Sequence, residues 1–260
     1  YHNWSGITPS HDLAAAFEME DGTLMTGFSN VGDKKTSNPY LNREPRFYAT
    51  IGFDGCTWGR VRPADAYPLD PTPLGQLQCG YYEVSGVEST VKIKLPPNDT
   101  ELTFKGLSGI DTRQGPIEDW NGSWTGYYER KLVDTSVDGQ NYAQNVPWTY
   151  FRLAEMYLIA AEASVELNEL EDAADYLDAL RNRIGMPDTK TTLTRRGKAF
   201  NQADMREFVR HERFVELAFE DHRYFDVRRW MIAPQTASRK LTGVLVYGLL
   251  KPGMTQPKPY

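Results

Sequence analysis

Apolar residues recur at helical spacing in two neighbouring segments of the second half of the chain. The first segment carries its stripe at Phe151, Ala154, Leu158, Ala161 and Val165. The second carries its stripe at Leu170, Ala173, Leu177, Leu180 and Ile184. Steps of three and four predict two amphipathic helices. Because only a short turn around Asn168-Glu169 separates them, we expect an antiparallel, tetratricopeptide-like helical hairpin that ends at Gly185.

Two further helices are predicted downstream of the hairpin. Residues 203–219 carry apolar side chains on one side, at Met205, Phe208, Val209, Val215 and Ala218. Residues 223–232 are also expected to be helical, and Pro234 should end that segment. The tail beyond Gly253 is rich in Pro and Lys and is expected to be a loop or an edge.

The first half of the chain has a different pattern. Short alternating segments at residues 47–51 and 91–95 predict strands, and clusters of Gly, Pro, Asn and Asp between them predict turns. We therefore expect residues 1–147 to be loop-rich and aromatic-rich and residues 148–260 to be helical. The predicted fold class is mostly α, with a tetratricopeptide-like hairpin, long helices, long irregular loops and a few short β-strands.

Composition narrows the possible functions. The chain has 260 residues with 29 Lys and Arg against 35 Asp and Glu, a formal net charge of −6. This acidity argues against nucleic acid as a partner, because binding phosphates requires clustered cations. No apolar run approaches the roughly 18 residues of a membrane-spanning helix. Cys56 and Cys79 are the only cysteines, which leaves one disulfide or two buried thiols open and makes a cysteine-based zinc site improbable.

Candidate catalytic motifs are weak. His211-Glu212 begins a zinc-protease pattern, but Val215 occupies the position of the second histidine. Residues 212–230 contain acids and arginines three apart, in the pairs Arg213–Glu216, Glu220–Arg223 and Asp226–Arg229. Because arginine neighbours keep carboxylates ionised, we expect a structural lattice of ion pairs and not a catalytic pair. We expect no enzyme activity, no metal and no cofactor.

Aromatic residues in polar, Gly-rich loops are the remaining functional signal. They do not follow helical stripes, and they comprise Trp4, Trp58, Tyr67, Tyr81, Tyr82, Trp120 and Trp124. Flat apolar rings beside amide, hydroxyl and charged groups suit a sugar, whose C–H face stacks while its hydroxyls form hydrogen bonds. The alternative is that these rings only pin the long loops in place. We expect at least two of them to be exposed in a binding surface.

Six segments in order along the chain resemble the SusD/RagB family of Bacteroidetes outer-membrane nutrient-binding lipoproteins. Residues 150–163 (YFRLAEMYLIAAEA) resemble the family's "RxAEvyLxxAEA" helix, and residues 180–185 (LRNRIG) resemble the end of the next helix. Residues 212–230 resemble its "ERxxELaxEgxRyxDlrRW" signature. The other matches are LAAAFEMEDG at 13–22, NPYLNREPRFY at 38–48 and TGYYERK at 125–131.

The resemblance implies a fragment and a location. Family members are about twice as long, and their N-terminal half carries the lipid-bearing cysteine and most of the tetratricopeptide-like helices. We therefore expect both parts of this chain to belong to one domain whose N-terminal half is missing, and Tyr260 to be a break. The expected location is the extracellular face of the outer membrane. The membrane link is expected only through a lipid anchor in the missing part.

The resemblance also implies function by binding. Such proteins capture oligosaccharides, or in some members peptides, and pass them to a SusC-like TonB-dependent transporter. Alternatives are a glycoside hydrolase and a structural helical-repeat adaptor. Because ligand contacts in the family come from variable loops, our site residues come from the loop argument: Trp58, Tyr81, Trp120 and Trp124, with Arg113 and Asn121 as polar partners. Tyr127 and Tyr128 lie in the shared TGYY segment and are expected to be structural.

Overall fold

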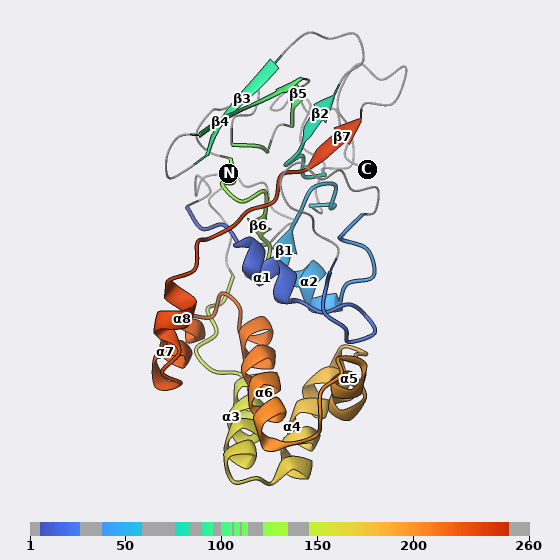
Figure 1. Cartoon of the computed structure of the whole chain (residues 1–260), viewed down its shortest axis with the longest axis vertical. Helices are drawn as coiled ribbons and strands as arrows, with labels where there is room; N and C mark the ends of the chain where they lie inside the picture. The colour runs from blue at the N-terminus through green and yellow to red at the C-terminus, as the bar shows by residue number, and fades with distance from the viewer. Residues whose placement is uncertain are drawn as a thin grey trace. The chain divides into compact units, whose positions relative to one another are not determined.

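A computed structural model describes nine stretches of the chain. They are residues 6–26, 38–58, 76–83, 90–95, 100–105, 107–109, 111–113, 122–134 and 146–249 (Figure 1). The chain forms two compact units. The loop-and-strand unit comprises Tyr1–His11, Ile51–Val146 and Thr242–Tyr260, and the helical unit comprises Asp12–Thr50 and Pro147–Leu241. One of these boundaries falls between residues 146 and 147, next to the expected division at residue 148, but residues 12–50 group with the helices and residues 242–260 with the loops. That residues 1–147 and 148–260 form one domain stays a prediction.

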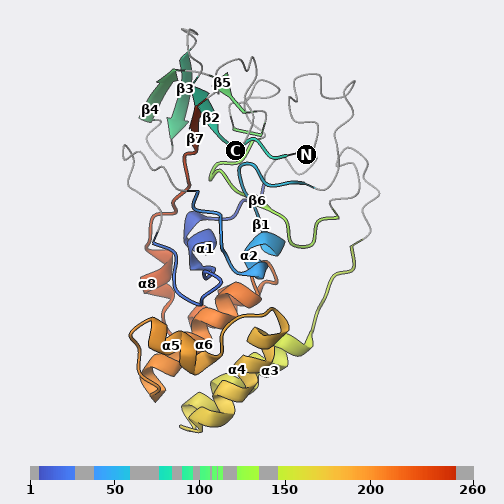
Figure 2. The same ribbon diagram turned by 90° about the vertical axis from the view of Figure 1, so that its right-hand side faces the viewer.

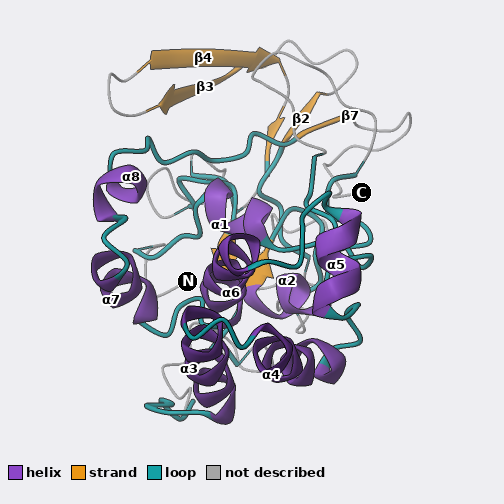
Figure 3. Ribbon diagram, turned by 60° about the horizontal axis from the view of Figure 1, so that its bottom comes forward, coloured by secondary structure: helices purple, strands orange, loops and turns teal. Residues whose placement is uncertain are grey.

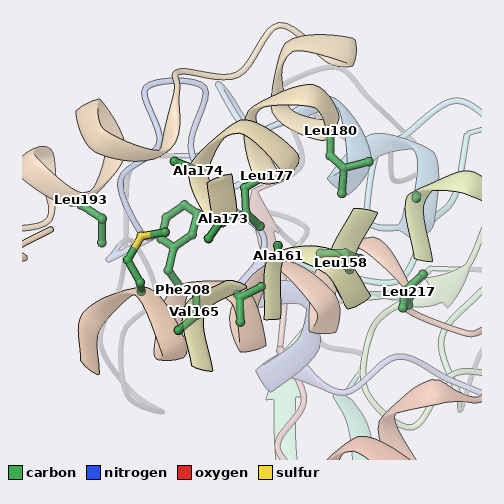
Figure 4. Packing of buried hydrophobic residues seen from close by; sticks show 13 residues of the cluster. Leu158, Ala161, Val165, Ala173, Ala174, Leu177, Leu180, Leu193, Phe208 and Leu217 are labelled. Atoms are coloured by element: carbon green, nitrogen blue, oxygen red, sulfur yellow. The ribbon is translucent and has the colours of Figure 1, made fainter. Parts of the chain in front are cut away.

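The predicted hairpin is the centre of the helical unit. It consists of α3 (Leu153–Glu166) and α4 (Leu170–Arg183). Between them Asn168 has a φ of 62°, a left-handed conformation that asparagine tolerates better than most residues. The long helix α6 (Gln202–Glu216) packs against α3 and α4, as Figure 3 shows. Leu158, Leu177 and Phe208 bring the three helices into one buried cluster (Figure 4).

The remaining helices of the structure are short. They are α1 (His11–Ala16), α2 (Pro45–Thr50), α5 (Thr189–Arg195), α7 (His222–Arg229) and α8 (Ala233–Ala237). The predicted strand at residues 47–51 is wrong, because α2 covers all but its last residue. Phe47 and Thr50 lie three apart and both are buried, so the helix places them on one side. Pro234 lies in the first turn of α8, where its missing N–H costs nothing, and it does not end α7.

The described strands of the loop-and-strand unit make three small sheets. β1 (Ile51–Gly52) pairs antiparallel with β6 (Tyr128–Glu129). β2 (Tyr81–Glu83) lies between antiparallel β5 (Leu107–Ser108) and parallel β7 (Tyr247–Leu249), as Figure 2 shows for β2 and β7. The predicted strand at residues 91–95 is confirmed within β3 (Thr90–Leu95), which pairs with β4 (Thr100–Lys105).

The two cysteines lie in a small core of this unit. Cys56 and Cys79 are buried with Leu77, and Phe53, Trp58 and Tyr128 pack around them. Neither sulfur is in a disulfide, so the alternative of two buried thiols is the correct one. Burial raises the pKa of the Cys56 thiol to about 11, which makes it a packing group and not a nucleophile. Among the residues described, no helix is long and apolar enough to cross a membrane.

Replacing Asp221 by glycine should stabilise the protein. Asp221 has a φ of 61°, and it occupies the position that is glycine in the family pattern quoted above. Its side chain makes no capping hydrogen bond to α7, so little is lost with it. Relief of the left-handed strain should raise the free energy of unfolding by about 0.5–1 kcal/mol. Urea unfolding would measure this, with Glu207→Gly in the exposed part of α6 as a control that should lose about 1 kcal/mol. An equal loss in both variants would contradict the explanation.

Candidate ligand-binding site

Two loop segments of the loop-and-strand unit meet at a close backbone contact. Thr112 and Ser123 form a parallel bridge between residues 111–113 and residues 122–125. Gly122 makes the approach possible, because a Cβ atom there would lie 2.1 Å from the carbonyl oxygen of Thr112 and 2.4 Å from the Cα of Arg113. These are backbone atoms that cannot rotate away. Only glycine therefore fits between the two segments, and we call the joined segments the loop platform.

A chain of hydrogen bonds holds the loop platform in place. The Ser123 amide donates to the Tyr128 hydroxyl at 3.0 Å, and that hydroxyl donates to the carbonyl oxygen of Asp111 at 2.6 Å. Asp111 is held in turn by Gln78, whose backbone N–H donates to a carboxylate oxygen of Asp111 at 2.9 Å. The Ser123 hydroxyl donates to the carbonyl oxygen of Tyr127 at 2.6 Å. Both segments are thus tied to β6 and to the residues that precede β2, which preorganises their side chains.

The loop platform presents an arginine stacked on a tryptophan. The guanidinium carbon of Arg113 lies 3.1 Å from the centre of the Trp124 ring, and Trp124 is 50% exposed. Arg113 covers one face of the indole, and half of Trp124 is nevertheless open to solvent. The pair offers an apolar face and a fan of N–H donors side by side. That combination can stack on the C–H face of a sugar and bind its oxygen atoms.

Two other predicted site residues, Tyr81 and Trp58, are packed in or against the core of their unit. Tyr81 is 7% exposed and belongs to the core of its unit. Trp58 is half-buried and packs on the cysteine cluster, so the burial of neither ring supports its predicted ligand contact. Trp120 and Asn121 lie outside the described residues. Tyr127 is fully buried and its hydroxyl lies 3.1 Å from the ring nitrogen Nδ1 of His11, in agreement with its expected structural role.

A buried charge network fills the space between α2, α4 and α6 in the helical unit. Arg46 contacts Glu44 at 2.6 Å, Glu216 at 3.0 Å and also Glu212. Arg181 contacts Glu18 at 2.9 Å and Glu212 at 3.0 Å. Every one of these side chains is less than 10% exposed. Arginine contacts on each acid support the expected structural role and not a catalytic carboxylate pair.

Two of the three predicted pairs have other partners. Asp226 pairs with Arg229 at 2.8 Å as predicted, and also with Arg213 at 3.0 Å. Glu216 contacts Arg46, Arg152 and Arg183 instead of Arg213. Glu220 pairs with Arg152 at 2.6 Å instead of Arg223. The expected lattice of ion pairs is therefore present, but Glu216 and Glu220 reach arginines of other segments instead of Arg213 and Arg223.

The acids of the network differ in protonation. Burial raises the pKa of Glu216, but Arg46, Arg152 and Arg183 outweigh it and lower the value to about 2. Burial dominates at Glu44 and raises its pKa to about 7. Two acids with separated pKa values suit acid–base catalysis only where they face an open cleft. Both side chains are at most 3% exposed, so no substrate reaches them in this structure.

His211 makes the stability of the helical unit depend on pH. Its pKa is lowered to about 4, chiefly by burial, although Glu18 and Glu212 favour the charged ring. Between pH 6.5 and 4 the unfolded chain therefore binds a proton that the folded chain does not, so stability falls as the pH falls. Because the ring is still 21% exposed, we expect the loss to be about 1–2 kcal/mol. Urea unfolding of the wild type and His211→Gln across this range should give a steeper fall for the wild type, and equal slopes would contradict the assignment.

The helical unit has an apolar hollow that the sequence patterns did not reveal. It is open to solvent, has a volume of about 580 Å³ and is lined mainly by aromatic and aliphatic side chains, including Phe214, Leu217, Phe219, Tyr224 and Phe225. Tyr224 and Phe225 are 58% and 64% exposed. The adjacent aromatic residues Tyr224 and Phe225 in α7 were the sequence signal for this hollow. Their spacing alone does not show whether they are buried or line an open surface. In the part of the chain that is described, no three His, Cys, Asp or Glu side chains form a metal-binding group.

Comparison with known proteins gives a consistent result. The model of the SusD family matches residues 1–258. A SusD-like protein of Bacteroides fragilis NCTC 9343 has a crystal structure that matches with a TM-score of 0.59 and 30% identity, over 89% of this chain and 37% of that one. A SusD-like carbohydrate-binding protein of the same organism matches with a TM-score of 0.56 and 25% identity, over 97% of this chain and 40% of that one.

A curated relative extends the comparison to sequence. SusD-like protein P25 of Formosa agariphila is 37% identical over 108 residues, which are 40% of this chain and 19% of that protein. The chain thus spans less than half the length of each of these relatives. The predicted fold class, mostly helical with a few short strands, is confirmed by the solved structures.

Proposed function

This chain belongs to the SusD family, and from that premise we propose that it captures oligosaccharides without catalysis. The captured glycan would pass to a SusC-like TonB-dependent transporter for import. The proposed location is the extracellular face of the outer membrane, with a lipid anchor as the link to the membrane. The whole protein's ligand and partner are part of this proposal, because the chain spans only part of its relatives.

The observation that carries the proposal is the Arg113–Trp124 pair. Its indole is half exposed, its guanidinium is stacked on the ring, and both stand on a loop platform held by hydrogen bonds. Preorganised aromatic faces lower the entropy cost of holding a flexible glycan. Similarity to a solved carbohydrate-binding relative supports the same ligand class. Trp58, Tyr81, Trp120 and Asn121 remain proposed contacts of lower rank.

A second candidate function is capture of oligopeptides, which the apolar hollow of the helical unit favours. Its aromatic walls at Phe214, Phe219 and Tyr224 suit apolar side chains better than hydroxyl-rich rings. In that case the transporter partnership would be the same, but the site would lie on α6 and α7 and not on the loop platform. Phe219→Ala would then weaken binding while Trp124→Ala would not.

Tryptophan-fluorescence titration against a ligand panel distinguishes these functions. The panel holds plant, fungal and host oligosaccharides and a mixed oligopeptide pool. We expect a saturable change in fluorescence with one class of oligosaccharide and none with peptides, because a sugar stacked on the exposed indole of Trp124 changes the emission of that indole. A response to peptides alone would overturn glycan capture and favour the second candidate. Release of reducing ends from a bound glycan would show hydrolysis and contradict the non-catalytic mechanism.

A further inference from the structure

We propose that the Arg113–Trp124 pair selects glycans that carry an anionic group, either a uronic carboxylate or a sulfate ester. The inference rests on the proposed glycan-binding function and adds the substrate class. Neither the fold nor the family relationship specifies the charge of the ligand that binds at the loop platform.

The distance between the two side chains determines how the guanidinium group of Arg113 is oriented. A guanidinium carbon 3.1 Å from the centre of the Trp124 ring leaves no space between the two groups. At that separation the planar group lies against the ring face, because no N–H bond has room to point at the indole. Its N–H donors therefore lie around the rim, in the plane of the group. In-plane pairs of N–H donors match the two oxygens of a carboxylate or sulfate.

The stacking also prepares Arg113 for an anion. The π face of the indole attracts the cation and holds a long side chain in one geometry. Part of the rotamer entropy that binding would cost is thus already lost in the free protein. A guanidinium has five N–H donors, so it can contact the protein and a ligand oxyanion at the same time.

The net charge of the chain cannot explain a preference for anionic glycans. With a formal net charge of −6, the chain does not attract anionic polymers in general. A preference for acidic glycans would therefore have to come from particular cations at the binding site. Arg113 is the cation that the described structure places against the exposed indole of Trp124.

Matched oligosaccharides with and without charge test the inference. Calorimetric titration would compare oligogalacturonate with its methyl ester, and a sulfated oligosaccharide with its desulfated form, at low and high salt. We expect the anionic member of one pair to bind about 10-fold more tightly, an advantage worth one charged hydrogen-bond pair. The pair that shows the preference distinguishes carboxylate from sulfate. High salt should reduce the advantage.

Variants of Arg113 assign the preference to this residue. Arg113→Gln should remove it while thermal unfolding stays unchanged, and Arg113→Lys should retain part of it, because lysine keeps the charge without the planar fork. Arg206→Gln, on the exposed side of α6 beside Glu166, is the matched control and should leave the preference intact. Equal binding of charged and neutral members, or a preference that survives Arg113→Gln, would overturn the inference alone. Absence of any glycan binding would overturn the proposed function and this inference together.

Discussion

Replacing Arg46 by methionine should destabilise the helical unit by about 3–5 kcal/mol. Arg46 is 7% exposed and contacts three carboxylates, those of Glu44, Glu212 and Glu216. Glu212 keeps Arg181 and Glu216 keeps Arg152, but Arg46 is the arginine in contact with Glu44 among the described residues. Arg46 lowers the pKa of Glu44, so its loss favours the protonated carboxyl there, and it also takes one counterion from each of the buried carboxylates of Glu212 and Glu216. Urea unfolding followed by circular dichroism would measure the change, or would show that the variant does not fold.

An exposed ion pair provides the control for this prediction. Arg206 contacts Glu166 at 2.6 Å, but both side chains are at least 30% exposed. Arg206→Met should cost less than about 1 kcal/mol, because water screens the pair. Adding Glu44→Gln to Arg46→Met should recover part of the stability, since it removes a buried carboxyl that has lost its cation. Similar unfolding midpoints for Arg46→Met and Arg206→Met would mean that the buried network contributes little.

Replacing Gly122 by alanine should separate the two segments of the loop platform and abolish ligand binding there. The new Cβ would meet the Thr112 carbonyl group at 2.1–2.2 Å, so the Thr112–Ser123 bridge has to open. Overpacking of this kind costs about 1–3 kcal/mol or more. Hydrogen exchange should show faster exchange of the Ser123 amide, which loses its acceptor, the Tyr128 hydroxyl. The buried amides of α3 and α6 should keep their protection.

Gly197→Ala is the control that distinguishes the effect of a steric clash, expected for Gly122→Ala, from the effect of backbone strain alone. Gly197 has a φ of 65°, but a Cβ there would meet no heavy atom within 4 Å. This control should therefore lose about 1 kcal/mol of stability and retain full ligand affinity. If Gly122→Ala bound the ligand as tightly as Gly197→Ala, the loop platform would not be the binding site.

The helical spacing of apolar residues predicted the long helices well, because a stripe that continues over several turns fits the helical period and not the strand period. The stripes at residues 151–165 and 170–184 became α3 and α4, and the helix predicted at residues 203–219 is α6, which begins one residue earlier and ends at Glu216. The segment at residues 47–51 failed because five residues fit both periods, and buried contacts of Phe47 and Thr50 decided for a helix. The partners of Glu216 were missed for a similar reason. Arg46 is 170 residues away from it, and local spacing carries no information about such a contact.

Residue types predicted part of the candidate site. Arg113 and Trp124 were chosen as aromatic and polar loop residues, and they meet because Gly122 lets two loop segments touch. Tyr81 and Trp58 have the same composition around them, yet the structure places them in or against the core of their unit. Sequence alone does not separate exposed from packed loop aromatics, since both occur beside Gly and polar residues. The separation comes from three-dimensional packing.

The exposed indole of Trp124 is the proposed contact that binds the glycan. Calorimetry of Trp124→Ala and Trp148→Ala against the oligosaccharide identified by the panel tests it most directly. The two tryptophans are 50% and 53% exposed, but Trp148 belongs to the helical unit and not to the loop platform. We expect Trp124→Ala to weaken binding about 10- to 100-fold and Trp148→Ala to leave it unchanged. Equal affinity of wild type and Trp124→Ala would contradict the claim.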